Sequence, residues 1–225
     1  MPSTVFQRAW LTACVAFALA IGAGLRYPGG TPRNPATVGY SMSHNFLSDL
    51  GMTVAYNGQP NGLGAAFFVG SLLVLIVGLG SCLFAITRLQ LSDAASRRWA
   101  RAAAACALLA CVGFVGVAIT PEDRVMSLHV SFTFWAWRFV PLGAGLMALA
   151  AFRSRVFPRR VALIWTLVTI LLASYVALMT WGPGVATPNG LLIQVLAQKA
   201  ATVIVVLAVV YLARETGARR VRASI

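Results

Sequence analysis

Charged residues are few in this sequence, and acidic residues are fewer than basic ones. Of 225 residues, 10% are charged and five are Asp or Glu. A soluble globular domain carries about 25% charged residues. With 59% hydrophobic residues and long apolar runs along the whole chain, the composition excludes a typical soluble domain and indicates a membrane protein.

Cysteine and histidine are also few, which limits the metal and redox chemistry that the chain supports. The four cysteines fall inside apolar stretches, at Cys14, Cys82, Cys106 and Cys111. This pattern excludes a disulfide framework and a CxxC metal site, and it predicts buried, inert thiols. With two histidines, a three-histidine zinc site is excluded, but a site of two histidines and one carboxylate stays open as an alternative. The sequence names no cofactor.

The long apolar runs predict six membrane-spanning helices. We place them at about 9–26, 62–87, 99–119, 128–152, 161–181 and 190–213. Each run is long enough to cross a hydrocarbon core of about 30 Å. Proline and glycine separate the runs, as in Pro28-Gly29-Gly30 and Pro183-Gly184. We therefore expect an all-α polytopic membrane protein in which residues 1–225 form a single six-helix transmembrane domain.

Basic residues predict the direction of these spans. The formal net charge is +13, which in a soluble protein would suggest nucleic acid, but here the arginines cluster between the spans. One side has only Arg26, Arg33 and Arg124. The other side has Arg8, Arg88, Arg97, Arg98, Arg101, Arg153, Arg155, Arg159, Arg160, Arg214, Arg219, Arg220 and Arg222. The positive-inside rule then predicts cytoplasmic termini, in a bacterial cytoplasmic membrane, and no nucleic-acid partner.

Residues 27–61 form the one long loop between predicted spans, on the outer side. Within it, "SHNFLSDLG" (43–51) gathers polar side chains in an otherwise apolar chain. Ser43 suits the N-cap of a short helix over 44–50, and Gly51 suits its C-terminal end. In such a helix Asn45 and Asp49 share a face. We expect this segment to fold back toward the bundle.

The outer side also carries most of the titratable side chains. A second predicted outer loop, "TPEDRVMSLH" (120–129), precedes the fourth span. Both histidines and three of the five acids therefore lie on the outer side. The candidates for acid–base chemistry there are His44, Asp49, Asp123 and His129.

Two cations fall inside predicted spans, Arg138 in the fourth and Lys199 in the sixth. A cation facing lipid at mid-membrane costs roughly 2.5–3.5 kcal/mol, so both should face the bundle interior or a wet cavity. Tyr175, Gln194 and Gln198 lie in the same outer half. We expect these five residues to line a polar cavity, open outward, for a phosphate or carboxylate headgroup. A salt-bridge and hydrogen-bond network without a ligand is the alternative.

Three stretches resemble a known family. They are "NFLSDLG" (45–51), "NGLGAAFFVGSLL" (61–73) and "TPEDRVMSLH" (120–129). Their order is similar to that of the bacterial membrane proteins grouped as domain of unknown function 998 (DUF998), which are remotely similar to Frag/DRAM-type membrane proteins. The matching positions are Ser48, Asp49, Leu50, Gly51, Asn61, Pro121, Asp123 and His129. The resemblance covers residues 1–150 and implies fold and topology, not activity; Lys199 matches no family signature.

The sequence supports several functions. The first is binding or processing of an anionic lipid or other anionic amphiphile, with membrane lipid as the partner. The second is a small transporter, or a non-enzymatic assembly partner of other membrane proteins. A third is acid-initiated isoprenoid chemistry, with Asp49 or Asp123 as proton donor and Trp135, Trp137 and Tyr175 around an apolar pocket. Neither enzymatic activity nor oligomeric state follows from the sequence.

Overall fold

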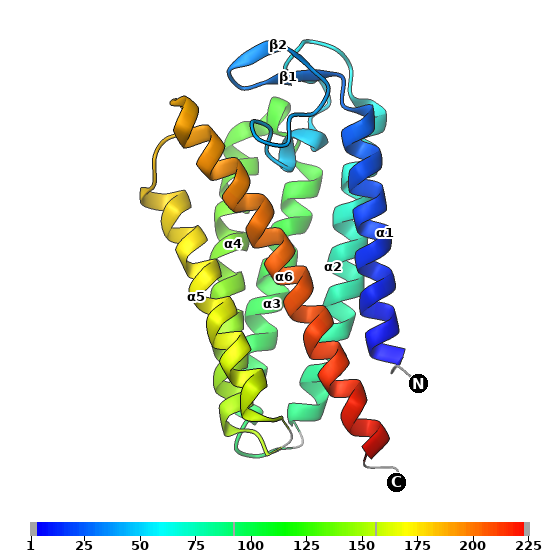
Figure 1. The fold of residues 1–225 in the computed structure, drawn as a ribbon, viewed down its shortest axis with the longest axis vertical. Helices are drawn as coiled ribbons and strands as arrows, with labels where there is room; N and C mark the ends of the chain where they lie inside the picture. The colour runs from blue at the N-terminus through cyan, green and yellow to red at the C-terminus, as the bar shows by residue number, and fades with distance from the viewer. Residues whose placement is uncertain (1–3, 92, 156, 223–225) are drawn as a thin grey trace.

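The computed structural model describes residues 4–91, 93–155 and 157–222, which form an elongated bundle of six helices (Figure 1). The helices are α1 (Thr4–Arg26), α2 (Gly62–Leu91), α3 (Arg97–Ile119), α4 (Glu122–Arg153), α5 (Arg159–Trp181) and α6 (Pro188–Arg222). All six are long and apolar enough to cross a membrane. The prediction of an all-α chain with six helices able to span a membrane is confirmed.

Helices that follow one another in the sequence pack side by side, and α6 closes the bundle by contacting α1, α2 and α5 (Figure 1). Short connections between α2 and α3 and between α4 and α5 force antiparallel neighbours. The first and last described residues, Thr4 and Arg222, lie at the same end of the bundle. We call this the basic end, because arginines lie in or next to the α2–α3 and α4–α5 connections: Arg88, Arg97, Arg98, Arg101, Arg153, Arg155, Arg159 and Arg160.

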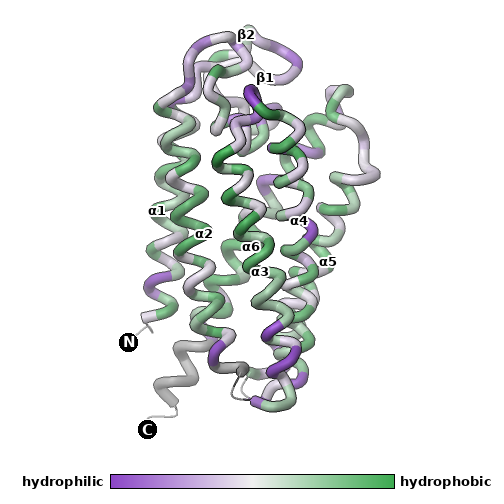
Figure 2. Tube along the Cα trace, turned by 180° about the vertical axis from the view of Figure 1, so that it is seen from behind, coloured by the Kyte–Doolittle hydropathy of each residue, from purple (hydrophilic) through white to green (hydrophobic). Residues whose placement is uncertain are grey.

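Residues 27–61 lie over the opposite end of the bundle, and we call them the cap (Figure 1). The cap contains a small antiparallel sheet of β1 (Gly29–Thr31) and β2 (Asn34–Val38), with Gly29 opposite Val38. It also contains a 3-10 helix, η1 (Ser48–Gly51). Figure 2 shows hydrophilic residues at the two ends of the bundle and hydrophobic residues between them, as expected for a membrane-spanning bundle.

The helix predicted over 44–50 is wrong in extent and type. Residues 42–44 form turns, and only Ser48–Gly51 are helical. Ser43 does not cap a helix, because its hydroxyl bonds to the side chains of Ser41 and His44. The side chain of Asn45 instead accepts a hydrogen bond from the amide of Ser41 (2.9 Å). This local side-chain bond favours a turn over a continuous helix.

Helix α4 begins earlier than the sequence predicted. We expected a loop over 120–129 and a span from about residue 128, but the helix starts at Glu122 and is kinked at Val125, where φ is −140° and ψ is 55°. Glu122 and Asp123 occupy the first turn, where the positive end of the helix dipole favours carboxylates. The predicted loop is therefore mostly helix, and His129 is buried within it.

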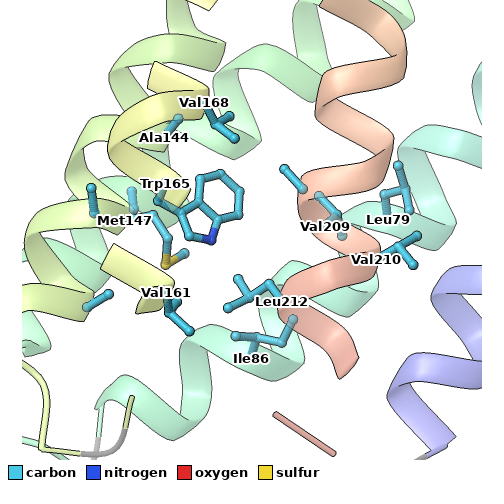
Figure 3. Close-up of a cluster of buried hydrophobic side chains, with 14 of the residues drawn as sticks. Leu79, Ile86, Ala144, Met147, Val161, Trp165, Val168, Val209, Val210 and Leu212 are labelled. Atoms are coloured by element: carbon cyan, nitrogen blue, oxygen red, sulfur yellow. The ribbon is translucent and has the colours of Figure 1, made fainter. Parts of the chain in front are cut away.

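The interior toward the basic end is apolar. Trp165 and Met147 meet Ile86 and Leu212 there, from four different helices (Figure 3). All four cysteines are free, but only Cys82 is buried; Cys106 and Cys111 are half-buried and Cys14 is exposed, so the expectation of buried thiols is confirmed for Cys82 and wrong for Cys14. The buried amide, carboxyl and imidazole side chains, by contrast, lie toward the capped end: Asn45, Asp49, Asn61, His129, Gln194 and Gln198.

Candidate functional site

The segment around η1 inserts between the ends of the helices. The 3-10 helix contacts α2 and α4, and the side chains of Asn45 and Asp49 are fully buried. Gly51 is required at this contact, because a Cβ there would lie 2.7 Å from the ring of Phe68. The expectation that this segment folds back onto the bundle holds, although its local structure differs from the predicted helix.

Asp49 lies at the centre of the inserted segment. Its Oδ2 atom accepts hydrogen bonds from the side-chain amide of Asn45 (2.9 Å) and the backbone amide of Phe46 (3.0 Å). Its Oδ1 atom is buried and has no hydrogen-bond partner among the described residues. Burial raises the pKa of Asp49 well above its ordinary value, and the charge of Glu122 raises it further. Asp49 therefore holds its proton to a higher pH than an exposed aspartate does.

Lys199 approaches the same segment from α6. Its ammonium group donates a hydrogen bond to the carbonyl oxygen of Asn45 and lies 5.2 Å from the ring centroid of Tyr40. Its positive charge lowers the pKa of Asp49, but less than burial and Glu122 raise it. Asn45 thus links Lys199 to Asp49, because its carbonyl oxygen accepts from Lys199 and its side-chain amide donates to Asp49.

Glu122 and His129 form the α4 side of the site. The Nδ1 atom of His129 lies 2.6 Å from the carbonyl oxygen of Thr120, which can only accept, so Nδ1 carries a proton. The Nε2 atom faces a carboxylate oxygen of Glu122 at 3.8 Å and has no hydrogen-bond partner among the described residues. A proton on either side of this gap relieves the repulsion between an imidazole lone pair and a carboxylate.

These residues form one connected group, which we call the acid–base cluster: Asp49, Glu122, His129 and Lys199. Ser48, next to Asp49, donates from its hydroxyl to Glu122 (3.4 Å), and the hydroxyl of Tyr56 donates to the other oxygen of Glu122 (3.4 Å). The arrangement combines a buried acid, a carboxylate–imidazole pair and a cation, which are the groups needed for proton transfer or for holding an anion.

Two of the predicted acid–base candidates lie outside this cluster. Asp123 accepts hydrogen bonds from the backbone amides of Thr53 (2.8 Å) and Val54 (3.1 Å), and it pairs with Arg124 (3.5 Å). It therefore fastens the cap to α4. His44 is half-buried, and its Nδ1 atom contacts the hydroxyl of Ser43 (2.7 Å).

The predicted ligand-binding residues do not form one site. Arg138 donates to the carbonyl oxygen of Phe134 and to the hydroxyl of Thr180 on α5, whereas Lys199 contacts the cap. Gln194 donates to the carbonyl oxygen of Leu178 (2.9 Å) and so links α6 to α5.

Gln198 and Tyr175 also lie apart. Gln198 accepts from the backbone amide of Leu47 (2.7 Å), at the edge of the acid–base cluster. Tyr175 packs in the apolar core with its ring edge-on to Trp137 (4.9 Å between centroids). Trp135, by contrast, is exposed and stacks on Phe139, so only two of the three aromatic residues proposed to line an isoprenoid pocket meet.

The sequence-based list of acid–base candidates did not include Glu122, and it did not include Asn45 as a link. Two signals pointed to them. Asn45 lies four residues before Asp49, and Glu122 lies seven residues before His129, close to two helical turns. No group of three or more His, Cys, Asp or Glu side chains in the described part of the chain is placed to hold a metal ion.

Comparison of the chain with protein-family models, curated proteins and solved structures gave no match. The resemblance to the DUF998 family therefore stays a prediction from the three motifs, and the argument for function rests on the acid–base cluster.

Proposed function

We propose that this chain is a multi-pass protein of the bacterial cytoplasmic membrane that binds or processes an anionic lipid or amphiphile at the acid–base cluster. The arginine-rich basic end faces the cytoplasm and the capped end faces outward, as the positive-inside rule favours. The headgroup binds at the capped end beside Lys199, and the apolar tail lies along the membrane-spanning helices.

The observation that carries this proposal is a pair of unsatisfied polar atoms beside a cation. Asp49 and His129 are 0% and 4% exposed, yet Asp49 Oδ1 and His129 Nε2 have no hydrogen-bond partner among the described residues. A buried polar atom without a partner costs about 1–3 kcal/mol. His129 and Lys199 lie in candidate membrane spans, where an ionisable group is a functional-site candidate by default. Lys199 supplies the positive charge that an anionic headgroup needs.

The cluster also has the composition required for an acid–base step on a bound headgroup. Asp49 is a buried carboxyl that holds its proton to a higher pH than an exposed aspartate does, and the Glu122–His129 pair accepts or donates a second proton. A positioned acid and base of this kind contribute about 100- to 10,000-fold to a reaction rate. A binding protein and an enzyme would use the same residues here. A measurement of whether the bound amphiphile is chemically changed distinguishes the two.

The test is lipid retention by the purified protein in native mass spectrometry. Lys199→Gln should weaken binding of anionic lipid by about 1.5–3 kcal/mol, the value of a hydrogen bond to a charged group, which is roughly 10- to 150-fold in Kd. Arg138→Gln is the matched control, because it removes a cation of the spans that contacts α5 instead of the cap. Binding of zwitterionic lipid should change in neither variant. Equal retention of anionic lipid by wild type and both variants would favour a network without a ligand.

A further inference from the structure

We infer that binding of the anion is coupled to uptake of one proton by the acid–base cluster, with Asp49 Oδ1, His129 Nε2 and the Lys199 ammonium as the three donors to the headgroup. This inference rests on the proposed function and adds a stoichiometry and a ligand class to it. The ligand is an amphiphile whose headgroup carries a single negative charge.

The starting point is the charge of the cluster without a ligand. A net charge buried away from water costs several kcal/mol, so the neutral states dominate. With Lys199 as a cation, neutrality requires a net charge of −1 on Asp49, Glu122 and His129 together. Two carboxylates and a neutral imidazole carry −2, so these three groups share one added proton. Such a proton belongs to the group as a whole and not to one residue.

No other titratable group near the cluster changes this charge count near neutral pH. From the cap, Tyr27, Tyr40 and Tyr56 face the cluster, and burial raises the pKa of each phenol, so all three stay neutral. Asp123 is the remaining nearby carboxyl, and its charge is paired with Arg124 at 3.5 Å. The net charge of the cluster near neutral pH therefore depends on Asp49, Glu122, His129 and Lys199.

A second proton turns the cluster into an anion site. With Asp49 and His129 both protonated, Glu122 ionised and Lys199 cationic, the net charge is +1, and one bound monoanion restores neutrality. The same proton also lets the two buried atoms that have no partner in the described part of the chain form hydrogen bonds. The two buried atoms without partners become donors, O–H at Asp49 Oδ1 and N–H at His129 Nε2, which suit the oxygens of an anionic headgroup. Proton and anion therefore each strengthen the binding of the other.

Access to these donors requires the cap to shift, because the inserted segment covers them. The link between Lys199 and the cap is the bond to the Asn45 carbonyl oxygen, and the link from Gln198 is the bond to the Leu47 amide. A headgroup oxygen that replaces the Asn45 carbonyl as acceptor keeps the ammonium satisfied. The cap then loses its hydrogen bond from Lys199, and the bound anion gains that bond.

The experiment uses the full chain in phosphatidylcholine nanodiscs and a short-chain phosphatidylglycerol as probe. A phosphodiester stays a monoanion over this pH range, so any pH dependence belongs to the protein. We expect Kd to rise about tenfold per pH unit between pH 6 and 8, the slope for one coupled proton. Calorimetry in buffers of different ionisation enthalpy should report uptake of about one proton per bound lipid. Short-chain phosphatidylcholine is the ligand control.

The decisive variant is Asp49→Asn with Glu122→Gln. It removes both carboxyls, so the cluster carries +1 from Lys199 without any added proton, and the amide introduced by Asp49→Asn supplies a donor in place of the carboxyl O–H. The Kd of this double variant for phosphatidylglycerol should depend on pH less steeply than that of wild type, with fewer protons taken up per bound lipid. Phosphatidylglycerol binding by Lys199→Gln in the same nanodiscs should be weakened about 10- to 150-fold over the same pH range.

The outcomes separate the two proposals. If wild type binds phosphatidylglycerol with a Kd that is flat in pH and without proton uptake, the coupling is wrong and the proposed function stands. If wild type binds it no better than phosphatidylcholine at any pH, the proposed function itself fails. These wild-type measurements decide the matter even if the double variant does not fold.

Discussion

At the scale of single residues, Asp49 is the side chain whose environment departs most from what its type favours. It is fully buried, it receives two hydrogen bonds on one oxygen and none on the other within the described chain, and it lies near a second carboxyl. Its neighbour Asn45 uses its whole amide group, because it also donates to the carbonyl oxygen of Gly30 (3.1 Å). Asn45 thus joins the sheet of the cap to Asp49.

The raised pKa of Asp49 predicts a pH dependence of stability. Because the folded-state pKa is above the ordinary value, the stabilisation from the protonated carboxyl is full below the ordinary pKa. It is lost as pH rises through the raised value, by up to about 1.4 kcal/mol per pH unit. The side chain introduced by Asp49→Asn does not titrate. We therefore expect the Tm of wild type to fall relative to that of Asp49→Asn as pH rises from 6 to 9 in detergent.

Asp93 provides the control for this measurement. The amide of Arg155 donates to its carboxylate (2.7 Å), and this bond lowers the pKa of Asp93. The stabilisation of the fold by the ionised Asp93 carboxylate is therefore present above the ordinary pKa, and it is lost only as pH falls through the lowered pKa. Asp93→Asn should shift Tm by a constant amount between pH 6 and 9. Parallel curves for wild type and Asp49→Asn would show that Asp49 is already ionised at pH 6.

At the scale of elements, the cap is attached to α1 and α2 by an apolar cluster that includes Leu50 and Phe68, and to α4 and α6 by side chains that bond to cap backbone. Gln198 and Lys199 on α6 contact Leu47 and Asn45, and Asp123 on α4 contacts the backbone around Thr53. The contacts made by a few hydrogen bonds open at a lower free energy than the apolar helix contacts of the core. The segment around η1 is thus the part of the capped end best suited to move when a ligand binds.

Gln198→Met should loosen this segment, because it leaves the Leu47 amide without its acceptor. The loss of one hydrogen bond is worth about 1 kcal/mol, so amide exchange over residues 45–50 should accelerate about fivefold. Hydrogen–deuterium exchange with mass spectrometry measures this directly. Gln194→Met, one helical turn earlier, is the matched control, since Gln194 bonds to Leu178 and Pro183. It should leave exchange of the cap unchanged, and equal acceleration in both variants would contradict the assignment.

At the scale of the whole molecule, the bundle separates an apolar interior at the basic end from a polar interior at the capped end. The cluster of Trp165, Met147, Ile86 and Leu212 fills the first region, and the acid–base cluster occupies the second. A polar region on one side of the bundle suits a ligand that arrives from that side only. This asymmetry supports binding at the capped end over a continuous polar path through the bundle.

The orientation of the molecule is directly testable with reporter fusions. A fusion after Asp93 or after Phe157 should report a cytoplasmic location, and a fusion at Gly58 or Gly184 should report an external one. Gly58 lies in the cap, and Gly184 lies between α5 and α6 at the same end. An external signal from the Phe157 fusion would reverse the orientation and place the acid–base cluster on the cytoplasmic side.

The sequence by itself determined the number and order of the helices, and therefore the placement of both chain ends at one end of the bundle, although α1, α4 and α6 each begin before the predicted span. A membrane span is a property of about twenty consecutive residues, so it is readable from local composition. The tertiary structure alone decided that Asp49, Glu122, His129 and Lys199 meet, and that Arg138 contacts α5 instead of the cap. Those contacts depend on the rotation of each helix about its axis and on the path of the cap across the bundle, and neither is encoded in a short stretch of residues.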